Sequence, residues 1–288
     1  MGNVPVSGVF GADPDLRPDL HPGSLARTIR QERRGTLRWL VHPPRHRPPP
    51  PRAAGRTRGR EIALRGPRGR LAATRWGGDG DPVVLYVHGH SRSRWDALCL
   101  VDHALSLGLA VVALDCSGSG QSEGSCVSWG LWEADDVEAA LAALPPPACL
   151  WGADMGAVAC MRCLQASPRE VQLVVEDPFE DLPGLCGDRM RAAGLPAAAH
   201  RALYLDMRRL VLADCGFDLD KAGLDPRSPV PCRHMHVVVS DRHEVVAPHH
   251  GERLARRHRP RSTLERHHQP AGEPPPVSLI RRLLRAAA

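Results

Sequence analysis

The stretch Cys149-Leu-Trp-Gly-Ala-Asp-Met-Gly156 decides the fold, because a short apolar run stops there at a glycine and a segment of helical composition begins. Gly152 and Gly156 flank Asp154 in the spacing G-x-D-x-G. This spacing is typical of a nucleophile elbow, a sharp strand-to-helix turn that holds one side chain above the edge of a sheet. The glycines permit the turn because they lack the Cβ atom that would clash there. Serine usually occupies the central position, so the role of Asp154 is the main question.

Strands alternate with helices on both sides of this stretch. The apolar runs predict a hairpin followed by buried strands, in chain order 61–64, 71–76, 82–87, 109–114, 148–152, 171–175, 235–239 and 262–265. Helical patterns fall between them at 94–107, 129–144, 155–166, 249–258 and 276–286. Near-continuous apolar strands of this kind predict an α/β fold, with a mostly parallel central sheet and helices on both faces. Residues 178–230 have helical pieces and no clear strand, which predicts an inserted helical lid region above the strand ends.

The N-terminal residues 1–59 differ in composition from the rest of the 288-residue chain. Residues 1–60 hold 12 arginines and 4 acidic residues, and a proline- and arginine-rich run extends over 43–60. Such a run buries too little apolar surface to fold alone, so we expect a partly disordered basic arm at 1–59, with a short helix at 24–41, and a domain at 60–288. The arm is a candidate for weak contact with a membrane surface, or it is a solvated linker. No nucleic-acid partner is expected, since no aromatic residues lie among the arginines of 43–60 to stack on bases.

Cysteine usage and hydropathy bear on the compartment. Nine cysteines without a spacing framework favour a reducing compartment, so we predict a cytoplasmic protein, with peripheral membrane attachment as the alternative. Cys160 and Cys163 form a C-x-x-C that we assign to helix packing. We predict no metal and no cofactor, and no segment reaches the length of a membrane span. The start Met1-Gly2 resembles an N-myristoylation signal, but Val6 occupies the hydroxyl position of that motif.

Several polar residues follow predicted strands, where the ligand site of such a sheet lies. Asp154 is at the elbow, Glu244 follows the strand at 235–239, and His268 follows the last strand. The backbone N–H groups of His90 and Met155 are the natural donors to a developing oxyanion. Glu244 is equally well explained as an exposed loop acid.

Four other polar residues near strand ends have structural explanations. His88 belongs to a His-Gly turn, and Asp115 is expected to accept hydrogen bonds from backbone amides of the next loop. His249 and His250 are expected to flank the start of the helix after Pro248.

The chain resembles the α/β-hydrolase fold family, in its serine-aminopeptidase and acyl-hydrolase-like branch. The resemblance covers about residues 60–288 and is carried by four segments: Val83-Val-Leu-Tyr-Val-His-Gly-His-Ser-Arg-Ser-Arg94, Leu114-Asp-Cys-Ser-Gly-Ser-Gly-Gln-Ser-Glu-Gly124, Leu150-Trp-Gly-Ala-Asp-Met-Gly156 and Val237-Val-Val-Ser-Asp-Arg-His-Glu-Val-Val-Ala-Pro248. It implies an α/β-hydrolase fold with Asp154 at the nucleophile position, Glu244 as the triad acid and His268 as the triad histidine. It also implies His90 and Met155 as the oxyanion-hole donors.

The aspartate at the elbow leaves three hypotheses. In the first, the chain is a hydrolase of ester or amide bonds by ancestry, weak or inactive because Asp154 replaces serine. In the second, it is a non-catalytic pseudohydrolase that binds a small acyl ligand or a protein partner. In the third, Asp154 is a working nucleophile, as in haloalkane dehalogenases and epoxide hydrolases, although Ser91, Met155 and the presence of only Tyr86 and Tyr204 depart from those families. The sequence leaves the oligomeric state open.

Overall fold

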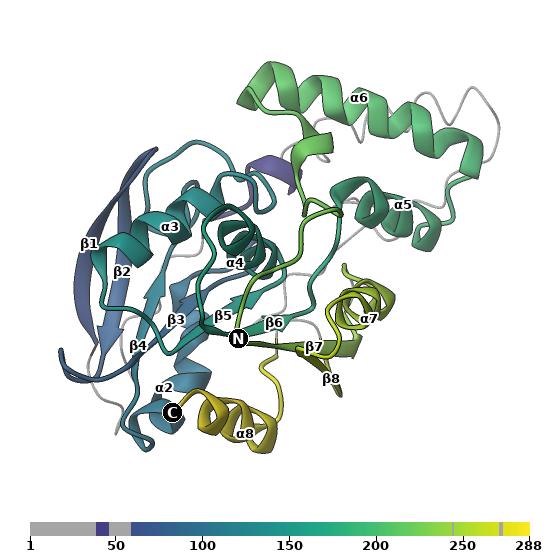
Figure 1. The fold of residues 1–288 in the computed structure, drawn as a ribbon. Coiled ribbons are helices and arrows are strands. Elements are labelled where there is room, and N and C mark those ends of the chain that lie inside the picture. Colours follow the sequence, from purple (N-terminus) through teal and green to yellow (C-terminus); the bar gives the residue numbers. More distant parts are fainter. Residues whose placement is uncertain (1–38, 46–58, 244, 271–272) are drawn as a thin grey trace.

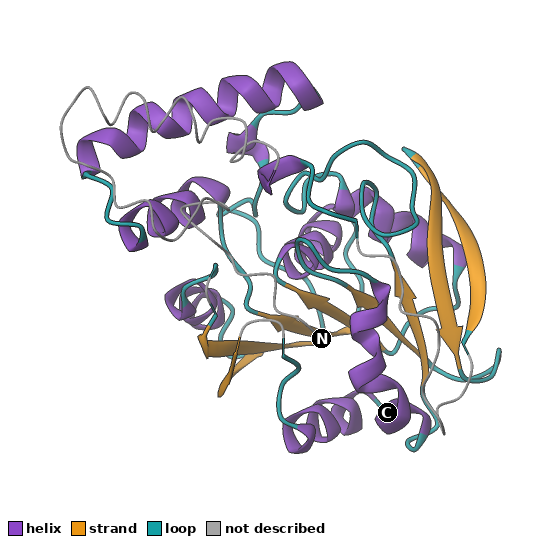
Figure 2. Ribbon diagram, turned by 180° about the vertical axis from the view of Figure 1, so that it is seen from behind, coloured by secondary structure: helices purple, strands orange, loops and turns teal. Residues whose placement is uncertain are grey.

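The computed structural model describes residues 39–45, 59–243, 245–270 and 273–288, and Figures 1 and 2 show it from opposite sides. The described residues form an eight-stranded sheet in the order β1-β2-β4-β3-β5-β6-β7-β8. The first hairpin is antiparallel and β2 pairs antiparallel with β4, whereas all other neighbouring strands are parallel. The strands are β1 (Arg60–Gly66), β2 (Gly69–Trp76), β3 (Val83–Val87), β4 (Ala110–Leu114), β5 (Cys149–Ala153), β6 (Gln172–Glu176), β7 (His234–Arg242) and β8 (Ser262–Pro270).

Helices cover both faces of the sheet. Helices α3, α4 and α7 pack on one face, and α2 and α8 pack on the other (Figure 1). The helical elements are η1 (Arg94–Ala97), α2 (Leu98–Leu105), α3 (Glu133–Ala143), α4 (Met155–Ala166), α5 (Leu182–Ala192), α6 (Ala197–Cys215), η2 (Leu219–Lys221), α7 (Pro248–Arg257) and α8 (Val277–Ala287). The predicted fold, a mostly parallel sheet between two helical layers, is therefore confirmed.

The central strands show why the sequence requires two covered faces. All five residues of β3 are buried, and their side chains alternate between the two cores of the domain. Leu85 packs on the α3–α4 side, whereas Val84 and Tyr86 pack on the α2–α8 side. A strand that is apolar on both faces is stable only where both faces are covered.

The lid region follows β6 as predicted. Helices α5 and α6 extend to one side of the sheet, with α6 at the outer edge of the molecule (Figures 1 and 2). Leu203, Met207 and Val211 bury one stripe of α6, and Leu212 on the opposite side is 52% exposed. In the described part of 178–230, the β-pairing consists of an isolated bridge between Asp181 and Gly223.

Part of the predicted arm packs with the domain. Residues 39–41 are helical, which agrees with the predicted helix end at residue 41, and Leu40 and Val41 are fully buried. The Leu40 carbonyl accepts the indole N–H of Trp129 at 2.7 Å, and the Val41 carbonyl accepts the N–H of Val127 at 2.9 Å. We call residues 39–45 the roof segment. Residues 1–38 and 46–58 of the arm, including the start that resembles a myristoylation signal, lie outside the described residues.

Strand β8 extends further than the sequence indicates. The predicted end at Glu265 is wrong by five residues, because β8 pairs with β7 as far as Arg242 and Pro270, through an irregularity between Ser240 and Arg242. Within the described residues, no helix has the length and apolarity needed to cross a bilayer.

Candidate active site

Asp154 occupies the turn between β5 and α4, with φ 48° and ψ −113°. This strained conformation is sterically demanding for a residue with a side chain. Its two flanking glycines are required by close approaches. A Cβ atom on Gly152 would lie 2.5 Å from the carbonyl oxygen of Gly156, and one on Gly156 would overlap the backbone of Val87 and His88. The structure thus has the backbone geometry of a nucleophile elbow, with an aspartate at its tip.

The carboxylate of Asp154 lies beside the two N–H groups predicted to bind an oxyanion. The backbone N–H of His90 donates to its Oδ2 at 3.1 Å, and the N–H of Met155 also favours its charged form. Gly89 permits this approach, because a Cβ atom there would lie only 3.2 Å from the same oxygen. The two predicted oxyanion donors are thus directed at the protein's own side chain. The other oxygen, Oδ1, is buried and has no hydrogen-bond partner among the described residues.

Burial dominates the electrostatics of Asp154, whose residue surface is 9% exposed. Desolvation raises the pKa of its carboxyl from 3.8 to about 7, against the opposing effects of the His90 N–H, the Arg92 guanidinium and the Met155 N–H. Near neutral pH the carboxyl is therefore divided between its neutral and charged forms.

A second buried acid, Asp177, lies at the carboxyl end of β6 with φ 44°. Its Oδ1 accepts the N–H of Ser240 at 2.7 Å, and its Oδ2 is 3.9 Å from Nε2 of His243. Burial raises the pKa of Asp177 well above its usual range, and the charges of Glu176 and Asp154 add to the rise. The charge of Asp154 therefore influences the ionisation of Asp177.

His243 is a neutral, oriented imidazole. Its Nδ1 accepts the N–H groups of Val246 at 2.8 Å and Val245 at 3.2 Å, so the proton resides on Nε2, which faces Asp177. Burial, aided by the positive charge of Arg92, lowers the pKa of His243 to about 4. Sequence reasoning missed this Asp–His pair. The available signal was that Asp177 directly follows a buried strand, as Asp115 does, and that His243 lies in a segment already singled out.

Of the two predicted triad partners, His268 is not brought to Asp154. Glu244 lies outside the described residues. His268 lies within β8, its side chain is 84% exposed, and its Nδ1 is 3.1 Å from the carboxylate of Asp241. Its neighbour His267 points inward and is 6% exposed, because side chains alternate along a strand. Burial lowers the pKa of His267.

Aromatic rings close the site from the side of the roof segment. The rings of His90 and Trp129 stack with centroids 4.3 Å apart, and Trp39 of the roof segment lies 4.6 Å from His90. Trp129 itself has a positive φ of 58°, and Phe179 packs on its edge. Burial lowers the pKa of His90 to about 3, so this imidazole is neutral. In this structure the elbow is therefore covered.

His88 and Asp115 have the structural roles that the sequence predicts. His88 accepts the N–H of Cys116 at 3.1 Å and is fully buried. Asp115 accepts the backbone N–H groups of Arg94 and Gln121, as predicted for a loop anchor.

The two helix-flanking histidines and the C-x-x-C also have structural surroundings. His249 and His250 lie in the first turn of α7, and each has its Nε2 3.1 Å from a carboxylate oxygen of Asp188 on α5. Cys160 and Cys163 are buried on α4, as expected for packing.

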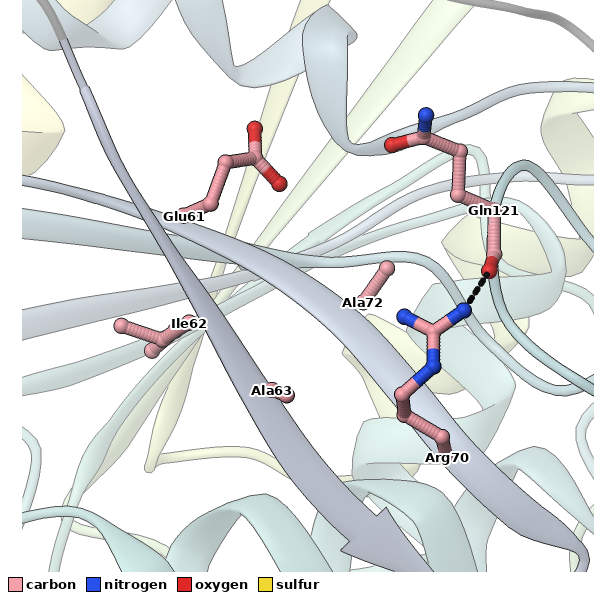
Figure 3. A pocket seen from close by; sticks show the side chains of 6 residues that line it. All are labelled: Glu61, Ile62, Ala63, Arg70, Ala72 and Gln121. Carbon is pink, nitrogen blue, oxygen red and sulfur yellow. Dashed lines mark hydrogen bonds between the residues drawn. The ribbon is translucent and has the colours of Figure 1, made fainter.

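A hollow of about 280 Å³ lies on the β1–β2 hairpin (Figure 3). Arg70 bridges its wall by donating to the carbonyl of Gln121 at 3.2 Å. Its lining residues are Glu61, Ile62, Ala63, Arg70, Ala72 and Gln121. None of them belongs to the predicted catalytic set, so this hollow offers no substrate pocket for Asp154.

Comparison with known proteins agrees with this geometry. Three solved structures are similar over most of their length: an esterase from Pyrococcus furiosus (TM-score 0.62, 18% identity, covering 86% of this chain and 97% of the other), mouse alpha/beta hydrolase domain-containing protein 10 (0.60, 20%, 80% and 96%), and a serine hydrolase without a lid from Xanthomonas campestris (0.52, 18%, 81% and 94%). At such identities the likeness shows the fold alone. No curated protein matches the chain in sequence. The model of the alpha/beta hydrolase family matches residues 84–281, and the chain belongs to that family.

Proposed function

We propose that this chain is a hydrolase-fold protein of acyl-hydrolase ancestry in which Asp154 suppresses the hydrolysis of esters and amides. The observation that carries the proposal is the hydrogen bond from the His90 N–H to Oδ2 of Asp154, at 3.1 Å. Hydrolysis of an acyl bond requires that donor to bind the oxygen on which negative charge develops. A carboxylate already at the donor both fills the position and repels a second anion.

The chemistry of the side chain supports the same conclusion. Attack of a carboxylate on an ester would form a mixed anhydride in place of the acyl-serine ester of this family. No imidazole among the described residues is hydrogen-bonded to Asp154, whose partner in His90 is the backbone N–H. Loss of one oxyanion donor alone costs about 100- to 1,000-fold in kcat, and loss of a serine nucleophile costs about a million-fold in kcat.

The test compares the parent with Asp154→Ser and Asp154→Ala, using short-chain acyl esters and a serine-reactive phosphonate probe. We expect background hydrolysis by the parent and by Asp154→Ala, because neither has a competent nucleophile. Asp154→Ser should gain ester hydrolysis and be labelled at position 154, because the change supplies a hydroxyl and frees the His90 N–H.

Two outcomes would overturn the proposal. Ester hydrolysis by the parent that Asp154→Ala abolishes would make Asp154 catalytic. A folded Asp154→Ser protein that neither hydrolyses esters nor reacts with the probe would mean that Asp154 is not what suppresses the site.

An aspartate-nucleophile hydrolase is the second candidate, favoured by the free Oδ1 of Asp154 at the elbow tip. The tyrosines do not favour epoxide chemistry. Tyr204 donates its hydroxyl to Asp220 at 2.7 Å, and Tyr86 is buried in the α2–α8 core. Turnover of any member of an epoxide and haloalkane panel by the parent, lost in Asp154→Asn, would establish this candidate.

The remaining expectations stay predictions. They are a small acyl ligand or protein partner for the site, weak membrane contact by residues 1–59, and a cytoplasmic location. Asp154→Ala should bind a short fatty acid more tightly than the parent if an acyl site persists beneath the roof segment, and equal affinities in equilibrium dialysis would count against it.

A further inference from the structure

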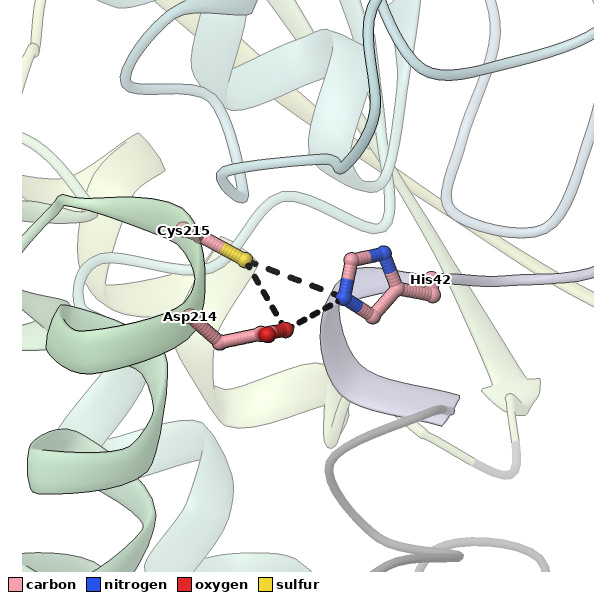
Figure 4. Close-up of side chains that lie close together, drawn as sticks. All are labelled: His42, Asp214 and Cys215. Atoms are coloured by element: carbon pink, nitrogen blue, oxygen red, sulfur yellow. Dashed lines mark hydrogen bonds and ion pairs between the residues drawn. The ribbon is translucent and has the colours of Figure 1, made fainter.

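Two segments that are distant in the sequence bring metal-binding side chains together (Figure 4). His42 comes from the roof segment, and Asp214 and Cys215 come from the end of the lid helix α6. His42 Nε2 lies 2.6 Å from Oδ2 of Asp214 and 4.0 Å from Sγ of Cys215. Sγ of Cys215 lies 3.8 Å from the same carboxylate oxygen. One nitrogen, one sulfur and one oxygen donor therefore converge on a common point.

A fourth donor lies beside them, from a third segment. Cys126, in the loop after the glycine-rich turn, is 4% exposed, and its thiol lies near the Cys215 thiol and the His42 imidazole. The set is then an imidazole, two thiols and a carboxylate. Two sulfurs and a histidine are the donors preferred by zinc, whereas magnesium and calcium take oxygen ligands.

The imidazole of His42 is held in the orientation that metal binding requires. Its Nδ1 donates to the carbonyl of Ser125 at 2.9 Å, which directs Nε2 at the cluster. Metal-binding histidines are commonly fixed by this kind of outer hydrogen bond. The same bond links the roof segment to the loop that carries Cys126.

The distances among the His42, Asp214 and Cys215 donors fit a tetrahedral ion after sub-ångström movements. Zinc with Zn–N and Zn–O near 2.0–2.1 Å and Zn–S near 2.3 Å separates nitrogen from oxygen by about 3.4 Å, and sulfur from either by about 3.6 Å. The two sulfur distances, 4.0 and 3.8 Å, need to shorten by a few tenths of an ångström. The 2.6 Å contact between His42 and Asp214 needs to widen as the ion replaces the shared proton.

We propose that His42, Cys126, Asp214 and Cys215 form a structural zinc site that fastens the roof segment and the lid helix to the body of the domain. Four protein ligands leave no open coordination position, which is typical of structural rather than catalytic zinc. The site is independent of any reaction at Asp154. The ion would hold the roof segment in place, and with it Trp39, whose ring packs on His90.

The test uses the full chain, purified under reducing conditions, stripped with a chelator and titrated with Zn²⁺ or Co²⁺. We expect one zinc per chain by elemental analysis. The Co²⁺ form should show thiolate-to-cobalt charge-transfer absorption and the strong visible bands of a tetrahedral ion. Zinc should also raise the thermal unfolding midpoint of the parent.

Cys215→Ser and His42→Gln should each weaken zinc binding by at least about 100-fold, since loss of even an outer hydrogen-bond partner costs about 10- to 100-fold. Both side chains are partly exposed, and circular dichroism without zinc should show that both variants fold. Cys232→Ser, at a buried cysteine elsewhere, is the matched control and should bind zinc like the parent. His249→Gln tests the other cluster of metal-binding residues, Asp188 with His249 and His250.

Three results would overturn the proposal. The first is that the reduced parent binds no zinc. The second is a Co²⁺ spectrum of the parent without the thiolate band. The third is zinc binding that is lost in His249→Gln and kept in Cys215→Ser. A disulfide between Cys126 and Cys215 that persists under reducing conditions, detected by mass spectrometry, would likewise exclude a zinc site built on two thiolates.

Discussion

Replacing Asp154 by asparagine should remove a pH-dependent penalty on stability. Asparagine has the same shape and keeps an oxygen for the His90 N–H, but it carries no charge. The folded-state pKa of Asp154 is raised, so burial disfavours the ionised carboxyl in the folded protein. Relative to the variant, the parent should lose stability as the pH rises from about 4, where the unfolded chain ionises, to about 7, where the folded one does.

The size of the effect follows from the two pKa values. They are 3.8 for the ordinary carboxyl and about 7 in the fold, a difference of about three. Each pKa unit corresponds to about 1.4 kcal/mol. The loss in the free energy of unfolding of the parent therefore approaches about 4 kcal/mol above about pH 7, and it vanishes below about pH 4. Since Asp154 is only 9% exposed, solvent screening reduces this figure little.

The assay is urea denaturation of the parent and Asp154→Asn at several pH values between about 4.5 and about 8.5. Titrating groups that do not interact with Asp154, such as Asp136, occur in both proteins and cancel in the difference between their unfolding free energies. Asp206→Asn, on α6, serves as the control for a charge removed outside the site. A difference that stays constant with pH, or that favours the parent at high pH, would refute the burial argument.

Three further changes test the fold around the site. Gly156→Ala should destabilise the protein by about 3 kcal/mol or more in denaturant unfolding, because its Cβ would overlap the Val87 carbonyl; a neutral effect would contradict the elbow geometry. Arg94→Met should cost about 3–5 kcal/mol, because it leaves the buried charge of Asp115 without its ion pair, and an unchanged thermal midpoint would argue against that pair. Trp39→Ala should cost about 2 kcal/mol and raise the acrylamide quenching of tryptophan fluorescence at the uncovered ring stack; unaltered quenching would mean that the roof segment does not cover it.

Much of the fold is readable from local patterns. The strands β3, β4 and β5 are continuous apolar runs, and the glycines around Asp154 mark the turn between β5 and α4. These features depend on neighbouring residues, which is why the sequence is sufficient to predict them. The positions of the His90 and Met155 backbone N–H groups beside Asp154 were predictable for the same reason, since they are fixed by the turn and by the His-Gly motif.

The positions of the histidines near the site could not be predicted, because they depend on contacts between segments that are distant in the sequence. Whether His267 or His268 faces inward is decided by the register of β8 on β7, and a shift of one residue exchanges them. The pair formed by Asp177 and His243 joins two strand ends 66 positions apart in numbering, and nothing in either segment predicts that contact. The sequence places Leu40 on the apolar stripe of the predicted helix 24–41, but its burial against the domain was not predicted, because the surrounding residues are rich in proline and arginine.

The roof segment also bears on the order in which the molecule assembles. Its contacts join residues far apart in the chain, with separations of 83 from His42 to Ser125, 89 from Leu40 to Trp129 and 172 from His42 to Asp214. Contacts that close such long loops form late, because the entropy of closure must be overcome before the contact contributes. We therefore expect the sheet to fold first and the roof segment to dock last, completing the covered elbow as the final step of folding. By the same reasoning, amide hydrogens of residues 39–45 should exchange before those of β3 and β5.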